Sequence, residues 1–233
     1  MEKIGLLGGT SYPSTIPYYD YLNREVQRRE GGYHTARLVL HNVDYHPIKS
    51  RYLEPNGWDE IPGLLLEELE ELAEADPACI VVCNNTLHKA VDVLEEERML
   101  SHIPPIIHIV DAVGAKALSE DFNRLLLLGT KFTMEDGFYA ERLRTKFGLS
   151  VDVPEEEDRN LIQAMQTEIA AGNIEDEFSW CFSDILRKYP AYDAIVLACT
   201  EIPLVVNEKS TSTPIIDPIK EQCDRALAFA YEM

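Results

Sequence analysis

Two cysteines, Cys83 and Cys199, each follow an apolar segment of the chain. Cys83 comes directly after Ile80-Val81-Val82, and Cys199 after the run 194–198; small polar residues follow both. This pattern is typical of a buried strand that ends in a loop and opens a helix. Ligands of open α/β sheets bind at such strand ends, and a helix start there favours thiolate over thiol. A single cysteine most often only packs, but two in the same setting predict a reactive pair.

Two thiols on opposite sides of a stereocentre suit racemisation, because a thiolate can remove a proton from one face while a thiol delivers one to the other. The thiolate is a competent base only if its pKa is lowered. The carbanion-like transition state also needs donors to the substrate carboxylate. Asn84, Asn85 and Thr86, at the predicted helix start, suit that carboxylate. Thr200 and the amide of Glu201 offer similar donors beside Cys199.

The elements that would position these cysteines occur twice. In the first half a strand over 3–8 ends at Gly8-Gly9-Thr10-Ser11, and Cys83 lies 73 residues after Thr10. In the second half a strand over 125–128 ends at Gly129-Thr130, and Cys199 lies 69 residues after Thr130. Strands that alternate with helices predict parallel sheets. We therefore expect an α/β fold of two pseudo-symmetric lobes, each a mainly parallel sheet flanked by helices, with the active site in the cleft between them.

The expected lobe boundaries follow from this tandem plan. Residues 1–105 with 212–233 form the first lobe, because the last strand and helix are expected to return to it, and 106–211 form the second. Hydrophobic spacing predicts a helix up to about Glu30 with Tyr18, Tyr19, Leu22 and Val26 on one face, and a helix over 58–75 with Leu65, Leu69 and Leu72 inward. Residues 104–109 are expected to be a strand, and 44–56 an irregular loop that carries Lys49 and Arg51.

Composition narrows the class of protein. The 233 residues carry a formal net charge of −20, which argues against a nucleic-acid partner because phosphate binding needs clustered Lys and Arg. The sequence contains no apolar run of the ~18 residues that a membrane span needs, and no signal-peptide pattern at its N-terminus. We expect a cytoplasmic protein. The five cysteines form no Cys-x-x-Cys motif, which favours reduced thiols over disulfides or a zinc site.

Three segments resemble the signatures of the aspartate/glutamate racemase family. They are Gly5-Leu6-Leu7-Gly8-Gly9-Thr10-Ser11-Tyr12, Cys83-Asn84-Asn85-Thr86-Leu87-His88 and Cys199-Thr200-Glu201-Ile202-Pro203. The second segment is most similar to the broad-specificity amino-acid racemase branch. The resemblance implies racemisation by two bases, Cys83 and Cys199, without pyridoxal phosphate or any other cofactor. It also implies a small amino-acid substrate and commonly a homodimer, while the cysteine spacing leads us to expect no metal.

The resemblance leaves the substrate open. Aspartate racemases of this family use an Arg after the second strand and a Lys on a second-lobe helix to hold the side-chain carboxylate. Lys49 or Arg51 could supply the first charge, but 161–172 contains no lysine, so aspartate, glutamate and a broader set all stay possible. The residues expected to contact substrate are Thr10, Ser11, Arg51, Asn84, Asn85, Thr86, Thr130, Thr200 and Glu201.

Each of these residues also has a simpler interpretation. The asparagines and threonines at helix starts could be caps, Thr10 and Ser11 could shape a turn, and Glu201 could face a helix dipole. Lys49 and Arg51 could be solvated surface, and His88 a structural histidine that could also tune Cys83. Two other functions remain: decarboxylation or isomerisation of a small dicarboxylate on the same scaffold, and non-catalytic binding of an amino acid.

Overall fold

The computed structural model describes residues 1–52 and 54–233, so Leu53, in the segment expected to be a loop, lies outside the described residues. The chain divides into two compact units, residues 1–109 with 222–233 and residues 110–221. Each unit contains its own parallel sheet. The expected fold class, an α/β chain with two mainly parallel sheets flanked by helices, is therefore confirmed.

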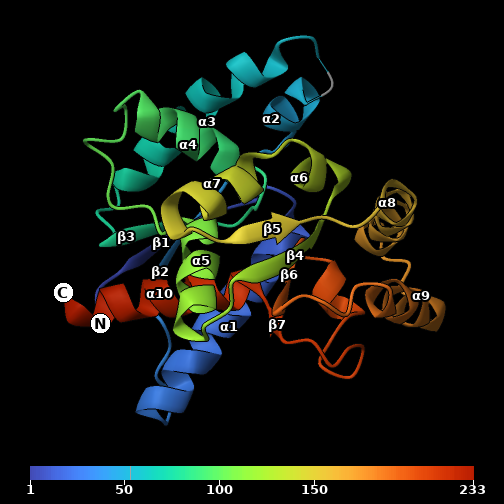
Figure 1. Ribbon diagram of the computed structural model, residues 1–233. Helices are drawn as coiled ribbons and strands as arrows, with labels where there is room; N and C mark the ends of the chain where they lie inside the picture. Colours follow the sequence, from blue (N-terminus) through green and yellow to red (C-terminus); the bar gives the residue numbers. More distant parts are fainter. Residues whose placement is uncertain (53) are drawn as a thin grey trace. The chain divides into compact units, whose positions relative to one another are not determined.

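The first unit is built on a three-stranded sheet with strand order β2-β1-β3 (Figure 1). The strands are β1 (Ile4–Gly8), β2 (Leu38–Asn42) and β3 (Cys79–Val82). Strands β1 and β3 are completely buried, which is why both are continuous apolar runs in the sequence. The helices of this unit are α1 (Tyr12–Glu30), α2 (His46–Arg51), the 3-10 helix η1 (Gly57–Asp59), α3 (Ile61–Ala73), α4 (His88–Glu96) and most of α10 (Pro218–Glu232).

Helix α3 packs its apolar face on this sheet. Leu65, Leu69 and Leu72 are buried, as their spacing predicts, and form one apolar cluster with Leu7 of β1 and Val82 of β3. Burial of a leucine side chain stabilises a fold by about 1.5–3 kcal/mol. This cluster therefore fixes the two strands whose carboxyl ends carry the glycine loop and Cys83.

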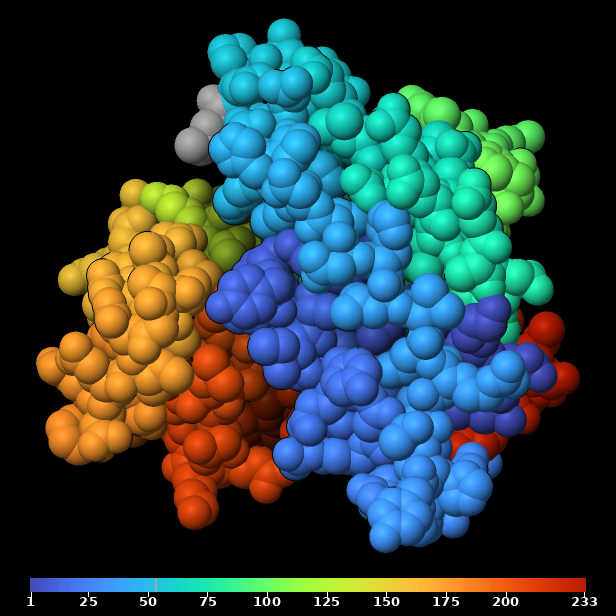
Figure 2. Space-filling view, turned by 180° about the vertical axis from the view of Figure 1, so that it is seen from behind, coloured from blue at the N-terminus to red at the C-terminus, as the bar shows by residue number. Residues whose placement is uncertain are grey.

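Helix α1 buries only part of the face expected from its sequence. Tyr18, Leu22 and Val26 are buried, at the i, i+4 and i+8 spacing of a helix. Tyr19, which was expected to share their face, is 55% exposed, because one residue along a helix turns the side chain by about 100°. Figure 2 shows part of α1, in blue, at the molecular surface.

The second unit has a four-stranded sheet with strand order β5-β4-β6-β7. The strands are β4 (Arg124–Gly129), β5 (Ser150–Asp152), β6 (Ala194–Ala198) and β7 (Ile215–Ile216). The helices are α5 (Ile109–Ser119), α6 (Lys131–Glu135), α7 (Phe138–Phe147), α8 (Glu156–Ala170), α9 (Asp176–Arg187) and the 3-10 helix η2 (Ile202–Leu204). Figure 1 shows β4 and β6 side by side, which their register confirms.

Both units follow the same local plan at the strands that lead to Cys83 and Cys199. In the first, Leu7 of β1 pairs with Val82 of β3, so that Gly8 and Cys83 come next on neighbouring strands. In the second, Gly129 at the end of β4 pairs with Ala198 of β6, one residue before Cys199. Each cysteine therefore leaves the sheet beside the loop that follows the neighbouring strand.

The structure differs from the sequence-based expectations in three places. Residues 104–109 form a single bridge, Ile106 to Ile80, instead of a strand, because Pro104 and Pro105 have no N–H to donate to a ladder. Strand β7 pairs with β6 and so lies in the second unit, not the first. The segment expected to be irregular contains α2, which has a proline in its first turn.

Among the described residues, no helix has both the length and the hydropathy that crossing a membrane requires.

The turn after β1 supplies the first test. Gly9 has φ +81°, and a Cβ there would lie 2.3 Å from the Val43 backbone oxygen. We expect Gly9→Ala to lower the free energy of unfolding by about 1–3 kcal/mol from backbone strain alone, as measured by urea denaturation. The matched control is Gly63→Ala in α3, where nothing lies within 4 Å of the new Cβ and alanine should stabilise the helix by about 0.5–1 kcal/mol. Equal stability of the two variants would contradict this role of Gly9.

Candidate functional site

The backbone of Cys83 is held by the β1 loop. Its amide donates to the Leu7 carbonyl at 3.0 Å, and its carbonyl accepts from the Thr10 and Ser14 hydroxyls, both at 3.3 Å. Thr10 is completely buried, whereas Ser11 is exposed. Thr10 therefore ties the glycine loop to the backbone of Cys83, and Ser11, which stands in the left-handed region with φ 71°, makes the turn into α1.

Asn84 organises the turn that follows Cys83. Its side-chain amide donates to the Thr10 carbonyl at 3.2 Å, and its side-chain oxygen accepts from the Leu87 amide at 3.0 Å. These bonds make Asn84 a link between the β1 loop and the start of α4, which begins at His88 instead of Thr86 as expected. Asn84 thus has structural partners in the turn that leads into α4, whose N-cap position is Leu87 and carries no side-chain cap.

Asn85 is different, because part of its side chain has no protein partner. The residue is 6% exposed, and among the described residues no group hydrogen-bonds to its buried side-chain oxygen. A buried, unpaired acceptor costs about 1–3 kcal/mol, so such a group in a native protein calls for an explanation. Thr86 is half-buried beside it. An N–H donor from a ligand would satisfy the Asn85 oxygen.

Cys199 has a carboxylate as its direct neighbour. Its thiol donates to the Glu201 carboxylate at 2.9 Å, and the Thr200 hydroxyl donates to the same oxygen at 2.7 Å. Thr130, at the end of the neighbouring strand, accepts from the Thr133 amide at 3.2 Å and caps α6. The structure thus brings Cys199, Thr200 and Glu201 together, whereas Thr130 has a structural partner of its own.

Burial raises the pKa of both thiols. For Cys83, the loss of hydration on complete burial raises the pKa. For Cys199, burial is again the largest cause, and the negative charge and hydrogen bond of Glu201 raise the pKa further, while the amides of Glu201 and Ile202 lower it. Both sulfurs are therefore held as neutral thiols at neutral pH. The expectation that a helix start favours the thiolate is outweighed by desolvation.

The two basic residues proposed for substrate binding have other partners. Arg51 forms ion pairs with Glu54 at 2.9 Å and with Glu60 at 2.8 Å. The Lys49 ammonium lies 4.5 Å from the centroid of the Tyr52 ring. The charge of Arg51 is therefore already compensated by two protein carboxylates.

Tyr45 was not identified from the sequence as a site residue. Its hydroxyl lies 3.5 Å from the Asn84 side-chain amide and 2.8 Å from the Tyr52 hydroxyl, and the Tyr52 ring stacks on Trp58 at 4.9 Å. This aromatic chain connects the α2 segment to the loop after Cys83. The only sequence signal was the aromatic content of residues 44–58.

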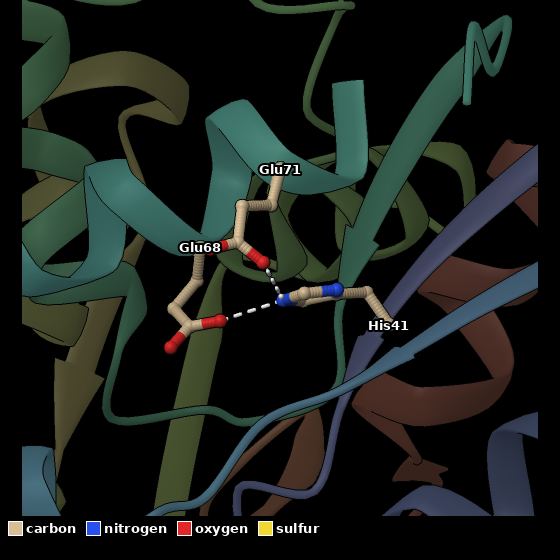
Figure 3. Close-up of side chains that lie close together, drawn as sticks. All are labelled: His41, Glu68 and Glu71. Atoms are coloured by element: carbon tan, nitrogen blue, oxygen red, sulfur yellow. Dashed lines mark hydrogen bonds and ion pairs between the residues drawn. The ribbon is translucent and has the colours of Figure 1, made fainter. Parts of the chain in front are cut away.

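Figure 3 shows a cluster of metal-ligand types on another part of the first unit, formed by His41 of β2 with Glu68 and Glu71 of α3. The His41 ring nitrogen lies 2.6 Å from Glu68 and 3.9 Å from Glu71. Two ligands on one tetrahedral zinc ion would be about 3.4 Å apart, whereas 2.6 Å is a charge-assisted hydrogen bond with a proton between the atoms. The cluster is thus a hydrogen-bonded contact that attaches β2 to α3.

Comparison with known proteins places these features in context. A family model described as Asp/Glu/Hydantoin racemase matches residues 7–226. Among curated proteins, a glutamate racemase from Actinobacillus pleuropneumoniae serotype 5b (strain L20) is 27% identical over 212 residues, which cover 86% of this chain and 77% of that protein.

Solved structures agree with this match. A protein assigned as an Asp/Glu racemase from Yersinia pestis is 33% identical, with a TM-score of 0.89 over 99% of this chain and 100% of that one. An aspartate racemase homologue from Pyrococcus horikoshii OT3 is 28% identical, with a TM-score of 0.82 over the same shares. The resemblance seen in the three sequence segments is confirmed, and the chain belongs to the Asp/Glu/Hydantoin racemase family.

Proposed function

We propose that the protein racemises an amino acid by moving its α-proton between Cys83 and Cys199, with no cofactor. Membership of the racemase family supports amino-acid racemisation in general. The observation that carries the finer assignment is the matched placement of the two cysteines. Each follows a buried strand beside the loop at the end of the neighbouring parallel strand, where α/β proteins bind ligands.

The proton balance is simple in this scheme. One sulfur, as thiolate, takes the α-proton and becomes a thiol, while the other thiol gives its proton to the opposite face of the carbon and becomes a thiolate. The reverse reaction uses the same two groups with their roles exchanged. After one turnover the negative charge has moved from one sulfur to the other, and proton exchange with water resets the pair.

Glu201 is the group that makes the first thiolate in this proposal. Its carboxylate already accepts the Cys199 thiol hydrogen, so transfer of that proton gives a thiolate and a carboxylic acid without loss of the hydrogen bond. The Glu201 and Ile202 amides, which lower the pKa of Cys199, stabilise the thiolate that results. Cys83, in contrast, has its sulfur 3.9 Å from the Val81 carbonyl oxygen, and within the described residues no carboxylate hydrogen-bonds to it.

The loop after Cys83 provides groups for the ends of the amino acid. The unpaired side-chain oxygen of Asn85 is suited to the substrate ammonium, which carries three donors. Thr86 is a hydroxyl donor for the carboxylate, whereas the single hydrogen of the Thr200 hydroxyl is already donated to Glu201. The proposed contacts therefore exploit an acceptor that the protein itself leaves unsatisfied.

The proposal specifies no single side chain for the amino-acid substrate. Helix α8 contains Arg159 but no lysine, and Arg159 is paired with Glu135 at 2.9 Å. Arg51 is also paired, so both of these arginines already face protein carboxylates. The proposal covers aspartate, glutamate and neutral amino acids, and the assay ranks them.

Replacement of either cysteine tests the two-base assignment. We expect Cys83→Ser and Cys199→Ser each to lower racemisation by at least about 10²–10⁴-fold, the contribution of a positioned acid or base. Proton NMR of aspartate, glutamate and neutral amino acids in D2O, with no added cofactor, measures loss of the α-proton, and chiral chromatography measures the enantiomers. Cys79→Ser, at a buried cysteine in the strand that leads to Cys83, is the control and should keep its activity. Full activity in either catalytic variant would refute the assignment.

A second prediction concerns the pKa of Cys199. Because the charge and hydrogen bond of Glu201 raise this pKa, Glu201→Gln should lower it, and Cys199 should react with iodoacetamide faster at a given pH near 8. Mass spectrometry of the Cys199 peptide across pH measures the alkylation rate, with Glu208→Gln at an exposed position as control. An unchanged alkylation profile would show that Glu201 does not control this thiol.

A further inference from the structure

His88 is a buried histidine that bonds to the loop after Cys83. It is completely buried at the start of α4, and its Nδ1 atom lies 2.7 Å from the backbone oxygen of Asn84. A carbonyl oxygen can only accept, so Nδ1 carries the hydrogen and donates it. The imidazole therefore holds the peptide group that joins Asn84 to Asn85.

The ring of His88 is itself fixed from several directions. Its Nε2 atom lies 3.3 Å from the side-chain nitrogen of Gln222 on α10, and that nitrogen also donates to the Ile107 carbonyl at 2.6 Å. The His108 ring packs edge-on against it with a centroid distance of 4.6 Å. These contacts fix the orientation of the His88 ring, and the ring in turn fixes the orientation of the Asn84 carbonyl.

The direction of that carbonyl sets the direction of a donor. In a trans peptide the C=O and the following N–H lie in one plane and point opposite ways. When His88 holds the Asn84 oxygen, the Asn85 N–H must point away from His88. Among the hydrogen bonds of the described residues, none has the Asn85 N–H as donor, although Asn85 is buried. This N–H is thus an oriented donor for which the described part of the chain supplies no acceptor.

We infer that His88 is a positioning residue that aims the Asn85 amide at the carboxylate of the substrate. This inference rests on the proposed function of Cys83, whose loop carries that amide. Removal of the α-proton moves negative charge onto the substrate carboxylate, so a fixed amide donor there stabilises the transition state more than the ground state. His88 acts through the peptide and does not touch the substrate.

Two substitutions separate this role from simple packing. In His88→Asn the side-chain nitrogen occupies the place of Nδ1 and keeps the bond to Asn84, whereas His88→Gln reaches toward the place of Nε2 and loses it. We expect His88→Asn to keep kcat within about threefold of wild type. We expect His88→Gln to lower kcat by about 10–100-fold with little change in KM, because a small misplacement of a catalytic group costs up to about 10²-fold.

The control is His41→Gln, at a partly buried histidine of β2 that bonds to Glu68 at 2.6 Å and has no part in fixing His88. It should lower the melting temperature to an extent similar to His88→Gln but leave kcat closer to wild type. Wild-type kcat in folded His88→Gln, or equal losses of kcat in His88→Asn and His88→Gln, would overturn the inference.

A measurement without turnover completes the test. The ¹⁵N-labelled Asn85 amide should shift on addition of the amino acid that exchanges its α-proton in the D2O assay, in wild type and in His88→Asn. No shift in the wild-type protein would overturn the inference even if His88→Gln fails to fold. An active Cys83→Ser variant instead refutes the proposed function, so the two failures are distinguishable.

Discussion

The parallel pairing of two buried strands is the constraint on which the rest of the structure depends. In the first unit, the hydrogen bond from the Cys83 amide to the Leu7 carbonyl extends the β1–β3 ladder by one residue. It places the cysteine at the point where β1 turns away through Gly8 and Gly9. The second unit repeats this arrangement with β4, β6 and Cys199. The apolar side chains that fill both faces of these strands fix the register, so the position of each sulfur follows from core packing.

Burial of the cysteines has opposite effects on placement and reactivity. A sulfur at the end of a buried strand is fixed in space, but the same low-polarity surroundings raise its pKa. The second unit compensates locally, because Glu201 offers an acceptor for the proton and two amides face the sulfur. In the first unit the polar groups surround the backbone of Cys83 and the Asn84–Asn85 turn instead. The two halves share a strand plan, but the groups around their sulfurs differ.

Much of the fold could be predicted from the sequence, because long periodic segments carry strong signals. Leu65, Leu69 and Leu72 lie inward as their spacing requires, and the apolar runs before Cys83 and Cys199 are the expected strands. Predictions from short sequence patterns were wrong where contacts with distant parts of the chain determined the structure. Strand β7 pairs with β6. Its two-residue apolar pattern does not specify which of the two sheets it joins.

The surroundings of the cysteines were predicted less completely. Their positions followed from the sequence, but the protonation of the thiols depends on desolvation by residues distant in the chain. The contacts of Tyr45 with Asn84, and of Gln222 with His88, join residues 39 and 134 positions apart. No local pattern specifies such contacts.

Thermodynamics limits how far the unequal surroundings of the two sulfurs can make the kinetics of the two enantiomers differ in the proposed reaction. The two enantiomers have equal free energies in water, and both directions pass through the same transition states. Because kcat/KM measures the transition state relative to free enzyme and free substrate, it must be the same for the L and the D form. In the proposed two-cysteine reaction, the carboxylate beside one sulfur can therefore change the two maximal rates only together with matching changes in the two Michaelis constants. The ratio kcat(L)/kcat(D) then equals KM(L)/KM(D), so an enzyme that turns over one mirror image faster must also have the larger KM for it.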